Sequence, residues 1–204
     1  MVGSRPTAAF AQVELETATI TAHQRFGRLY LDRYPDPLGF GKTTPSRFSD
    51  PRGRIERNRF GVLYLGESLR VCFLEAVLRD LRNGAVGDFP LTERELHVWC
   101  YAEIAISREL TLVDLRGNAA IRMGVPSDVA GASKQNLARL WSVAFHEHPE
   151  APDGIIYPSR LNNETNLAIY DRAIPNLAVH RVTPLIRAEG LAGVLTDLKV
   201  AIVP

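Results

Sequence analysis

The sequence predicts a single α+β domain in which a few helices accompany a mixed or mostly antiparallel sheet. Short apolar segments of strand type are scattered along the chain without the regular strand-helix alternation of a parallel α/β fold. With 204 residues, 46% of them hydrophobic and 23% charged, the chain can bury one sizeable core. It contains neither an internal repeat nor a low-complexity linker. One domain is therefore expected.

The first part of the chain predicts an arm followed by a strand, a loop and a second strand. Residues 1–25 are expected to form an N-terminal arm or a peripheral helix, because the helix-compatible run 7–19 lacks a strong apolar face. Residues 27–31 alternate as a strand does, and prolines and glycines mark 32–46 as a loop. The nearly continuous apolar run 60–65 predicts a strand at the centre of its sheet.

An amphipathic helix is predicted over 68–82, with Ser68 as its N-cap and Asn83-Gly84 as its end. Its apolar face repeats at helical spacing through Val71, Leu74, Leu78 and Leu81. Glu75 lies at the edge of that face, where an unpaired charge is costly. The helix alone favours a half-exposed Glu75 paired with Arg79 four residues later, a common surface arrangement.

The second half of the chain predicts further strands and two more helices. Alternating or apolar runs predict strands over 95–106, 110–114, 154–157, 167–170 and 179–185. A helix is expected in the second half of 128–146, where the apolar residues share one face, and a weak helix from about residue 189 closes the chain.

Composition argues against several classes of protein. The formal net charge of +1 gives no basic surface for a nucleic-acid backbone. Cys72 and Cys100 cannot form a disulfide framework. The N-terminus lacks the layout of a signal peptide, and no apolar run approaches the ~18 residues of a membrane span. We therefore expect a cytoplasmic protein with no membrane partner and no direct binding to nucleic acid.

Three short motifs suggest chemistry that their context rejects. Residues 41–43, Gly-Lys-Thr, lack the first glycine of a phosphate-binding P-loop, since Asp36 occupies its position. Residues 146–148, His-Glu-His, do not share a helical face and lack a nearby third ligand, so we expect a solvated helix end and no metal site. Ser159 stands in Tyr-Pro-Ser-Arg, which is not the elbow of a serine hydrolase.

A scattered set of polar residues remains, each on or beside a short element: Arg28, Arg47, Tyr64, Glu75 and Ser159. Each has an ordinary structural explanation. The arginines can form surface ion pairs, the tyrosine can be a core residue with a satisfied hydroxyl, and the serine can bond its own turn. The residues alone leave open whether they share a site.

Four segments in order, GRLY, SRFSDP, FGVLYLGESLRVCFLEAVLRD and DGIIYPSRLNNETNLAIYDRA, resemble the RES-domain toxins. The resemblance covers about residues 26–180 and is greatest to the mycobacterial branch, whose members degrade NAD. It implies a fold like that of ADP-ribosyltransferases, with an NAD cleft between two sheets. It also implies the toxin of a type II toxin–antitoxin system, with an Xre-type helix-turn-helix antitoxin that covers the cleft.

The resemblance divides the chain into the arm 1–25 and a RES domain over 26–204, and it assigns roles. It implies Glu75, Arg47 and Tyr64 as catalytic residues, and as NAD-binding residues it implies Arg28, Arg47, Tyr64, Ser159 and Asn166. NAD would be consumed as a substrate, with inorganic phosphate or water as the acceptor and without a cofactor. The alternatives are a protein mono-ADP-ribosyltransferase and a non-catalytic interaction domain.

Overall fold

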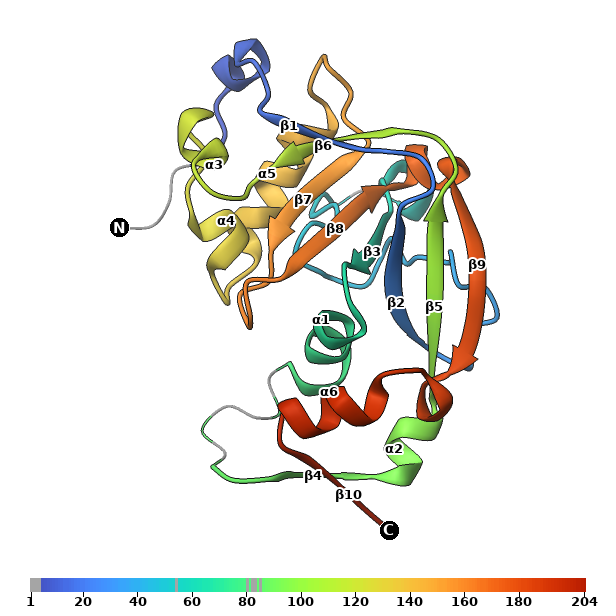
Figure 1. Ribbon diagram of the computed structural model, residues 1–204. Coiled ribbons are helices and arrows are strands. Elements are labelled where there is room, and N and C mark those ends of the chain that lie inside the picture. Colours follow the sequence, from blue (N-terminus) through green and yellow to red (C-terminus); the bar gives the residue numbers. More distant parts are fainter. Residues whose placement is uncertain (1–4, 54, 80, 82–83, 85) are drawn as a thin grey trace.

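A curled sheet forms the centre of the computed structural model, which describes residues 5–53, 55–79, 81, 84 and 86–204 (Figure 1). Its strands are β1 Thr17–Ile20, β2 Arg25–Leu31, β3 Val62–Gly66, β5 Trp99–Ile106, β6 Leu110–Asp114, β7 Gly154–Pro158, β8 Thr165–Tyr170 and β9 Leu177–Pro184. Their order is β1-β6-β7-β8-β3-β2-β5-β9. Neighbours in this order run antiparallel except β6 and β7, which run parallel. The predicted α+β class with a mostly antiparallel sheet is confirmed.

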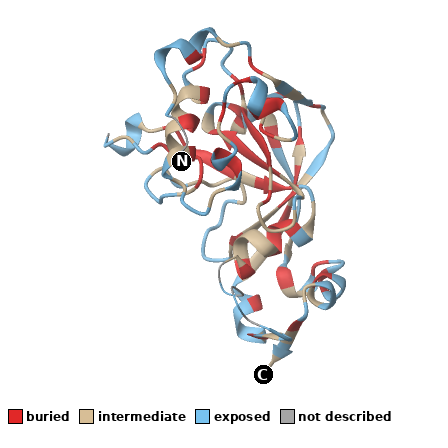
Figure 2. Ribbon diagram, turned by 90° about the vertical axis from the view of Figure 1, so that its left-hand side faces the viewer, coloured by how far each residue is buried: buried red, intermediate tan, exposed pale blue. Residues whose placement is uncertain are grey.

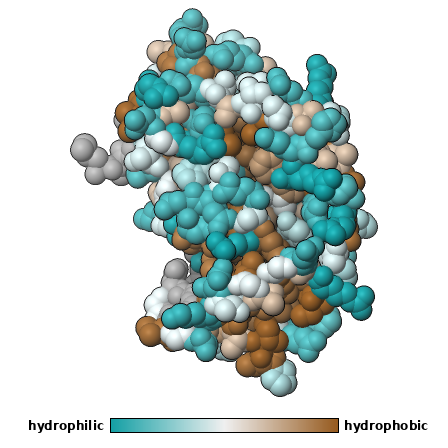
Figure 3. Space-filling model, in the orientation of Figure 1, coloured by the Kyte–Doolittle hydropathy of each residue, from teal (hydrophilic) through white to brown (hydrophobic). Residues whose placement is uncertain are grey.

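Helices cover one face of the sheet and build a lobe at its end. The helical elements are η1 Ala8–Gln12, η2 Glu56–Asn58, α1 Leu69–Phe73, η3 Leu74–Leu78, α2 Glu93–His97, α3 Ala119–Arg122, α4 Asp128–Gly131, α5 Asn136–His146, η4 Asp171–Asn176, η5 Leu185–Arg187 and α6 Leu191–Asp197. Strands β4 Phe89–Thr92 and β10 Val200–Val203 pair in parallel beside α2 and α6 (Figure 1). Apolar side chains gather at this end of the molecular surface (Figure 3).

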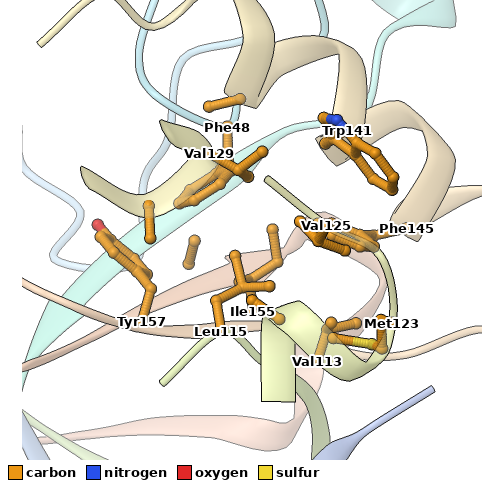
Figure 4. Close-up of a cluster of buried hydrophobic side chains, with 14 of the residues drawn as sticks. Phe48, Val113, Leu115, Met123, Val125, Val129, Trp141, Phe145, Ile155 and Tyr157 are labelled. Atoms are coloured by element: carbon orange, nitrogen blue, oxygen red, sulfur yellow. The ribbon is translucent and has the colours of Figure 1, made fainter. Parts of the chain in front are cut away.

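Side chains that alternate along the strands supply two hydrophobic cores. Val62 of β3 packs with α4 and α5 in the first core, whereas Leu63 and Leu65 point to the opposite face and into the second. Figure 4 shows the first core, where Trp141 and Phe145 of α5 meet residues of β6 and β7. Buried residues accordingly concentrate on the central strands (Figure 2).

A third core lies in the lobe built by α1, η3, α2, α6 and β10. Phe73, Leu78, Leu96 and Leu191 are among its buried members. The lobe therefore has its own hydrophobic core, and its elements α1 and η3 face the strands β2 and β3. This contact between the lobe and the sheet positions the candidate site.

Most predicted strands are confirmed, but the structure corrects the run 7–19, the start of the strand 95–106 and the length of the helix 68–82. The run 7–19 forms the short 3₁₀ helix η1 and then strand β1, because Phe10 and Leu15 anchor it in the first core and residues 17–20 pair with β6. The first residues of the predicted strand 95–106 form α2 instead. Thr92 caps that helix reciprocally with Glu95, and the two residues form a capping box.

The predicted helix 68–82 is shorter than expected. Ser68 is its N-cap, since the Ser68 hydroxyl accepts a hydrogen bond from the Val71 amide at 3.1 Å. The α-helical turns end at Phe73, and a π-helix continues to Leu78. Leu81, which we expected on the packed face, is 59% exposed because the helix has ended before it. The predicted stop at Asn83 lies outside the described residues.

Candidate active site

Two adjoining cavities lie where β2 and β3 meet the lobe. The inner cavity, about 200 Å³, is lined by residues of β2, β3, η3, β7 and β8 and by the loop at 46–47. The outer cavity, about 650 Å³, lies between β2 and the loop 34–44. Arg28, Ser46 and Tyr64 line both of them. The structure thus brings Arg28, Arg47, Tyr64, Glu75 and Asn166 onto one cavity wall, although up to 138 positions separate them in the sequence (166 − 28).

Glu75 lies in the π-helix η3 and lines the inner cavity. The wider turn is closed by a hydrogen bond from the Arg79 amide to the Leu74 carbonyl at 2.7 Å. Val77 and Leu78 of the same turn are buried in the lobe's core, so the turn is anchored on one side while Glu75 faces the cavity on the other. Single π-helical turns are rare in proteins, and those that occur are often found at functional sites.

Two buried side chains hold the Glu75 carboxylate. The Ser159 hydroxyl donates to Glu75 Oε1 at 2.8 Å, and the Asn166 amide donates to the same oxygen at 3.4 Å. Ser159 is fully buried and Asn166 is 5% exposed. Hydrogen bonds to an ionised group are about twice as strong as neutral ones, so these donors fix the orientation of the carboxylate. Glu75 is half-exposed, as the helix alone predicted, but it faces the cavity and its carboxylate is bound by Ser159 and Asn166.

Ser159 lies behind the carboxylate, at the start of the turn that joins β7 to β8. Its hydroxyl oxygen also accepts a hydrogen bond from the Leu161 amide at 3.2 Å, and its own amide donates to the Glu164 carbonyl at 2.7 Å. The turn thus fixes the hydroxyl before any ligand binds. The predicted direct contact between Ser159 and a substrate stays a prediction.

The loop that carries Arg47 is held from two sides. The Tyr64 hydroxyl accepts a hydrogen bond from the Phe48 amide at 2.8 Å and lies 2.9 Å from the Ser46 hydroxyl. Arg47 is 7% exposed and donates through Nη1 to the carbonyl of Ala132 at 2.8 Å. Burial lowers the pKa of Arg47 below its usual value. Burial likewise raises the pKa of Tyr64, so that hydroxyl stays protonated at neutral pH.

Arg28 stands at the junction of the two cavities. Its Nη2 donates to the Gly39 carbonyl at 2.6 Å, whereas the buried Nη1 has no hydrogen-bond partner within the part of the chain that is described. Burial lowers the pKa of Arg28 to about 10, which still leaves the guanidinium charged at neutral pH. A buried charged donor without a partner is costly, and an anionic ligand between the cavities would satisfy it.

Sequence reasoning did not assign four further residues to the inner cavity. Tyr157 and Arg79 line it, yet Tyr157 lies in an apolar strand and had the pattern of a core residue. A Cβ at Gly66 would lie 2.6 Å from Val71 Cγ1. Glycine at this position therefore lets α1 approach β3 closely. Cys72 also lines the cavity, and burial raises the pKa of its thiol to about 12, which makes it a poor nucleophile.

Neither a metal centre nor a membrane span is found in the described ranges. There, no group of three or more His, Cys, Asp and Glu side chains is placed to hold a metal ion. None of the helices there has the length and apolar character needed to cross a membrane. His148, which we expected at a solvated helix end, is 5% exposed, and its ring lies 5.7 Å from that of Phe10.

Comparisons with known proteins identify a matching family, a relative by sequence and a solved structure of similar fold. The family model of the RES domain matches residues 24–190, which include every residue of the predicted site. A Sinorhizobium fredii protein named "Probable toxin y4kH" is 41% identical over 127 residues, which are 62% of this chain and 100% of that protein. The fold is similar to that of a chain in the crystal structure of the M. tuberculosis MbcT–MbcA toxin–antitoxin complex. That match has a TM-score of 0.60 and 17% sequence identity, and it covers 89% of this chain and 91% of the other.

Proposed function

This chain belongs to the RES domain family, and from that membership and the geometry of the inner cavity we propose that it is the NAD-cleaving toxin of a toxin–antitoxin system. One observation carries the proposal. A carboxylate, Glu75, is fixed by two buried donors at a cavity that three guanidinium groups also line: Arg28, Arg47 and Arg79. The names of the relatives, one a probable toxin and one a toxin–antitoxin complex, support the biological role.

The arrangement suits the cleavage of the bond between nicotinamide and ribose. Nicotinamide leaves as a neutral molecule that takes the bonding electron pair with it, so its departure requires no proton donor. The ribose carbon becomes positively charged, as in glycoside hydrolysis. Glu75 stabilises that charge and holds the ribose hydroxyls. Because Ser159 and Asn166 already fix the carboxylate, it needs little reorganisation during the reaction.

The positive side chains bind the remainder of the dinucleotide. Arg28 and Arg47 hold the pyrophosphate, whose oxygens match the fork of a guanidinium and satisfy the unpartnered Nη1 of Arg28. Tyr64 packs against the nicotinamide or its ribose. Replacing Arg47 with Lys keeps the charge but loses the fork, so we expect a KM for NAD that is about tenfold higher.

The second substrate is the group that attacks the ribose carbon. Phosphate would give ADP-ribose 1″-phosphate, and water would give ADP-ribose and release a proton. Arg28 and Arg47 offset the charge of the pyrophosphate, and Arg79 adds a third positive charge to the cavity wall, which favours phosphate as the acceptor. Phosphorolysis is therefore the form of the reaction that we propose.

Such an enzyme would exhaust the NAD of its own cell unless it were held inactive. We expect its antitoxin, of the Xre helix-turn-helix type, to cover the mouth of the cavities, and the toxin to act in the cytoplasm. Coexpression tests this part of the proposal: the toxin gene alone should stop growth, and growth should return with the antitoxin or with Glu75→Gln.

The direct experiment mixes the purified protein, free of antitoxin, with NAD in phosphate buffer and in phosphate-free buffer. Mass spectrometry then identifies the products. Consumption only with phosphate establishes a phosphorylase, and consumption in both buffers establishes a glycohydrolase. ADP-ribose on proteins of a lysate would instead indicate a transferase. No reaction in any arm would favour an interaction domain and refute the proposal.

Glu75→Gln is the matched variant for this assay. It keeps the size of the side chain and the oxygen that accepts from Ser159, but it removes the negative charge. We expect a loss of roughly 100-fold or more in kcat, comparable to the loss of one preorganised electrostatic contact. Glu109→Gln, at an exposed site outside the cavity linings, is the control and should retain full activity.

A further inference from the structure

The outer cavity differs from the inner one in chemical character. Three aromatic side chains that do not line the inner cavity contribute to its wall: Tyr30, Tyr34 and Phe40. One carboxylate, Asp36, stands among the described residues of that wall. Arg28, Ser46 and Tyr64 line both cavities, so an elongated ligand that passes these side chains would extend from one cavity into the other.

The order of these features matches the order of the groups in a dinucleotide. Glu75 marks the inner end, where the bond to nicotinamide would break, and Arg28 marks the junction, where the pyrophosphate would lie. The adenosine half then falls in the outer cavity, whose aromatic wall suits a purine ring. An adenosine ribose that follows directly after the pyrophosphate would lie close to Asp36.

We infer that Asp36 makes the protein selective for NAD over NADP by accepting hydrogen bonds from the free hydroxyls of the adenosine ribose and repelling a 2′-phosphate. The inference rests on the proposed function and adds the identity of the preferred dinucleotide. A carboxylate accepts from a ribose diol, whereas a 2′-phosphate would bring about −1.5 to −2 charges to the same place. The Asp36 carboxylate and the 2′-phosphate of NADP would then repel each other at the edge of the cavity.

The local structure presents the carboxylate in a fixed way. Asp36 Oδ1 accepts a hydrogen bond from the Leu38 amide at 2.8 Å, a side-chain turn that holds the residue in the loop. The attraction between Asp36 and Arg28 also opposes the effect of burial on that arginine. Arg33 is a nearby cation that would attract a 2′-phosphate. Its guanidinium lies 5.1 Å from the centre of the Tyr34 ring, and it does not line the outer cavity.

The test compares kcat/KM for NAD and NADP in the wild type, in Asp36→Asn and in Asp32→Asn. The Asp36→Asn substitution retains a side-chain oxygen that can accept from the Leu38 amide, and it removes only the charge. Asp32 is an exposed acid in the same loop that does not line either cavity, so its variant is the matched control. We expect the wild type to prefer NAD by about tenfold or more, and Asp36→Asn to lose most of that preference through a lower KM for NADP.

A binding measurement separates this inference from the proposed function, because it needs no turnover. Calorimetry with ADP and with 2′-phospho-ADP should show the same preference in the wild type and its loss in Asp36→Asn. Equal binding of the two probes, no binding of ADP, or an equal effect of Asp32→Asn would overturn the inference even in an active enzyme. Selective binding of ADP by a protein that cleaves no NAD would refute the proposed function and support this assignment of the outer cavity.

Discussion

Replacing Ser159 with Ala tests how the carboxylate at the centre of the site is held. The hydroxyl is fully buried and donates to Glu75 Oε1 at 2.8 Å, and the change deletes this donor with little change in volume. A hydrogen bond to a charged group contributes about 1.5–3 kcal/mol. If all of it serves to orient Glu75, kcat/KM for NAD falls roughly 10- to 100-fold. The assay is the initial rate of nicotinamide release over a range of NAD concentrations.

A double-mutant cycle decides whether Ser159 acts through Glu75. In a Glu75→Ala background the donor has lost its partner, so adding Ser159→Ala should lower the remaining activity by less than about twofold. A full additional loss in that background would mean that Ser159 contacts the substrate directly. An unchanged kcat/KM in the single variant would refute the reasoning altogether. Urea unfolding of each variant excludes a general loss of structure as the cause.

Three further predictions concern stability. Gly154→Ala should lower the free energy of unfolding by about 1–3 kcal/mol in urea titrations, because its Cβ would lie 2.3 Å from the backbone oxygen of Ala168. Burial lowers the pKa of His146 to about 4, whereas the pKa of an unfolded histidine is about 6.5. The contribution of neutral His146 to the free energy of unfolding is therefore fully present above the unfolded pKa and is lost as the pH falls towards the folded pKa. His146→Phe should flatten this part of the pH profile. Tyr64→Phe leaves the Phe48 amide without its acceptor and should cost about 1–3 kcal/mol, also measured in urea.

Periodicity and capping chemistry were enough to predict much of the fold. The apolar run at 60–65 indicated a central strand, and β3 indeed lies between β8 and β2. Ser68 was recognisable as a cap because its side chain satisfies a free helix amide, a local effect. The N-terminal run 7–19 was misread because tertiary contacts decided its structure: its strand forms only by pairing with β6, nearly a hundred residues away.

The candidate site was less accessible to sequence reasoning. Glu75 stood out as a charge at the edge of an apolar face, but the π-helical turn that carries it leaves no clear local signal in the sequence. Its contact with Ser159 joins residues 84 positions apart, and only the assembled sheet brings them together. Tyr157 was hidden for a related reason, since a strand with one side on a cavity has the same apolar pattern as a strand in a core.

The three hydrophobic cores meet at the candidate site, and each of them fixes a different part of it. Phe48 of the first core anchors the loop of Arg47, Tyr30 of the second lies on the strand of Arg28, and Leu78 of the third ends the turn of Glu75. Because packed cores shift as units and resist gradual deformation, the spacing of the three charged groups follows from how the cores dock. A displacement of the lobe against the sheet would move Glu75 relative to both arginines, and it would also disturb the hydrogen bonds of Glu75 to Ser159 and Asn166. The contact of α1 with β3 at Gly66, where a Cβ would lie 2.6 Å from Val71 Cγ1, is therefore the place where the fold most directly controls the chemistry.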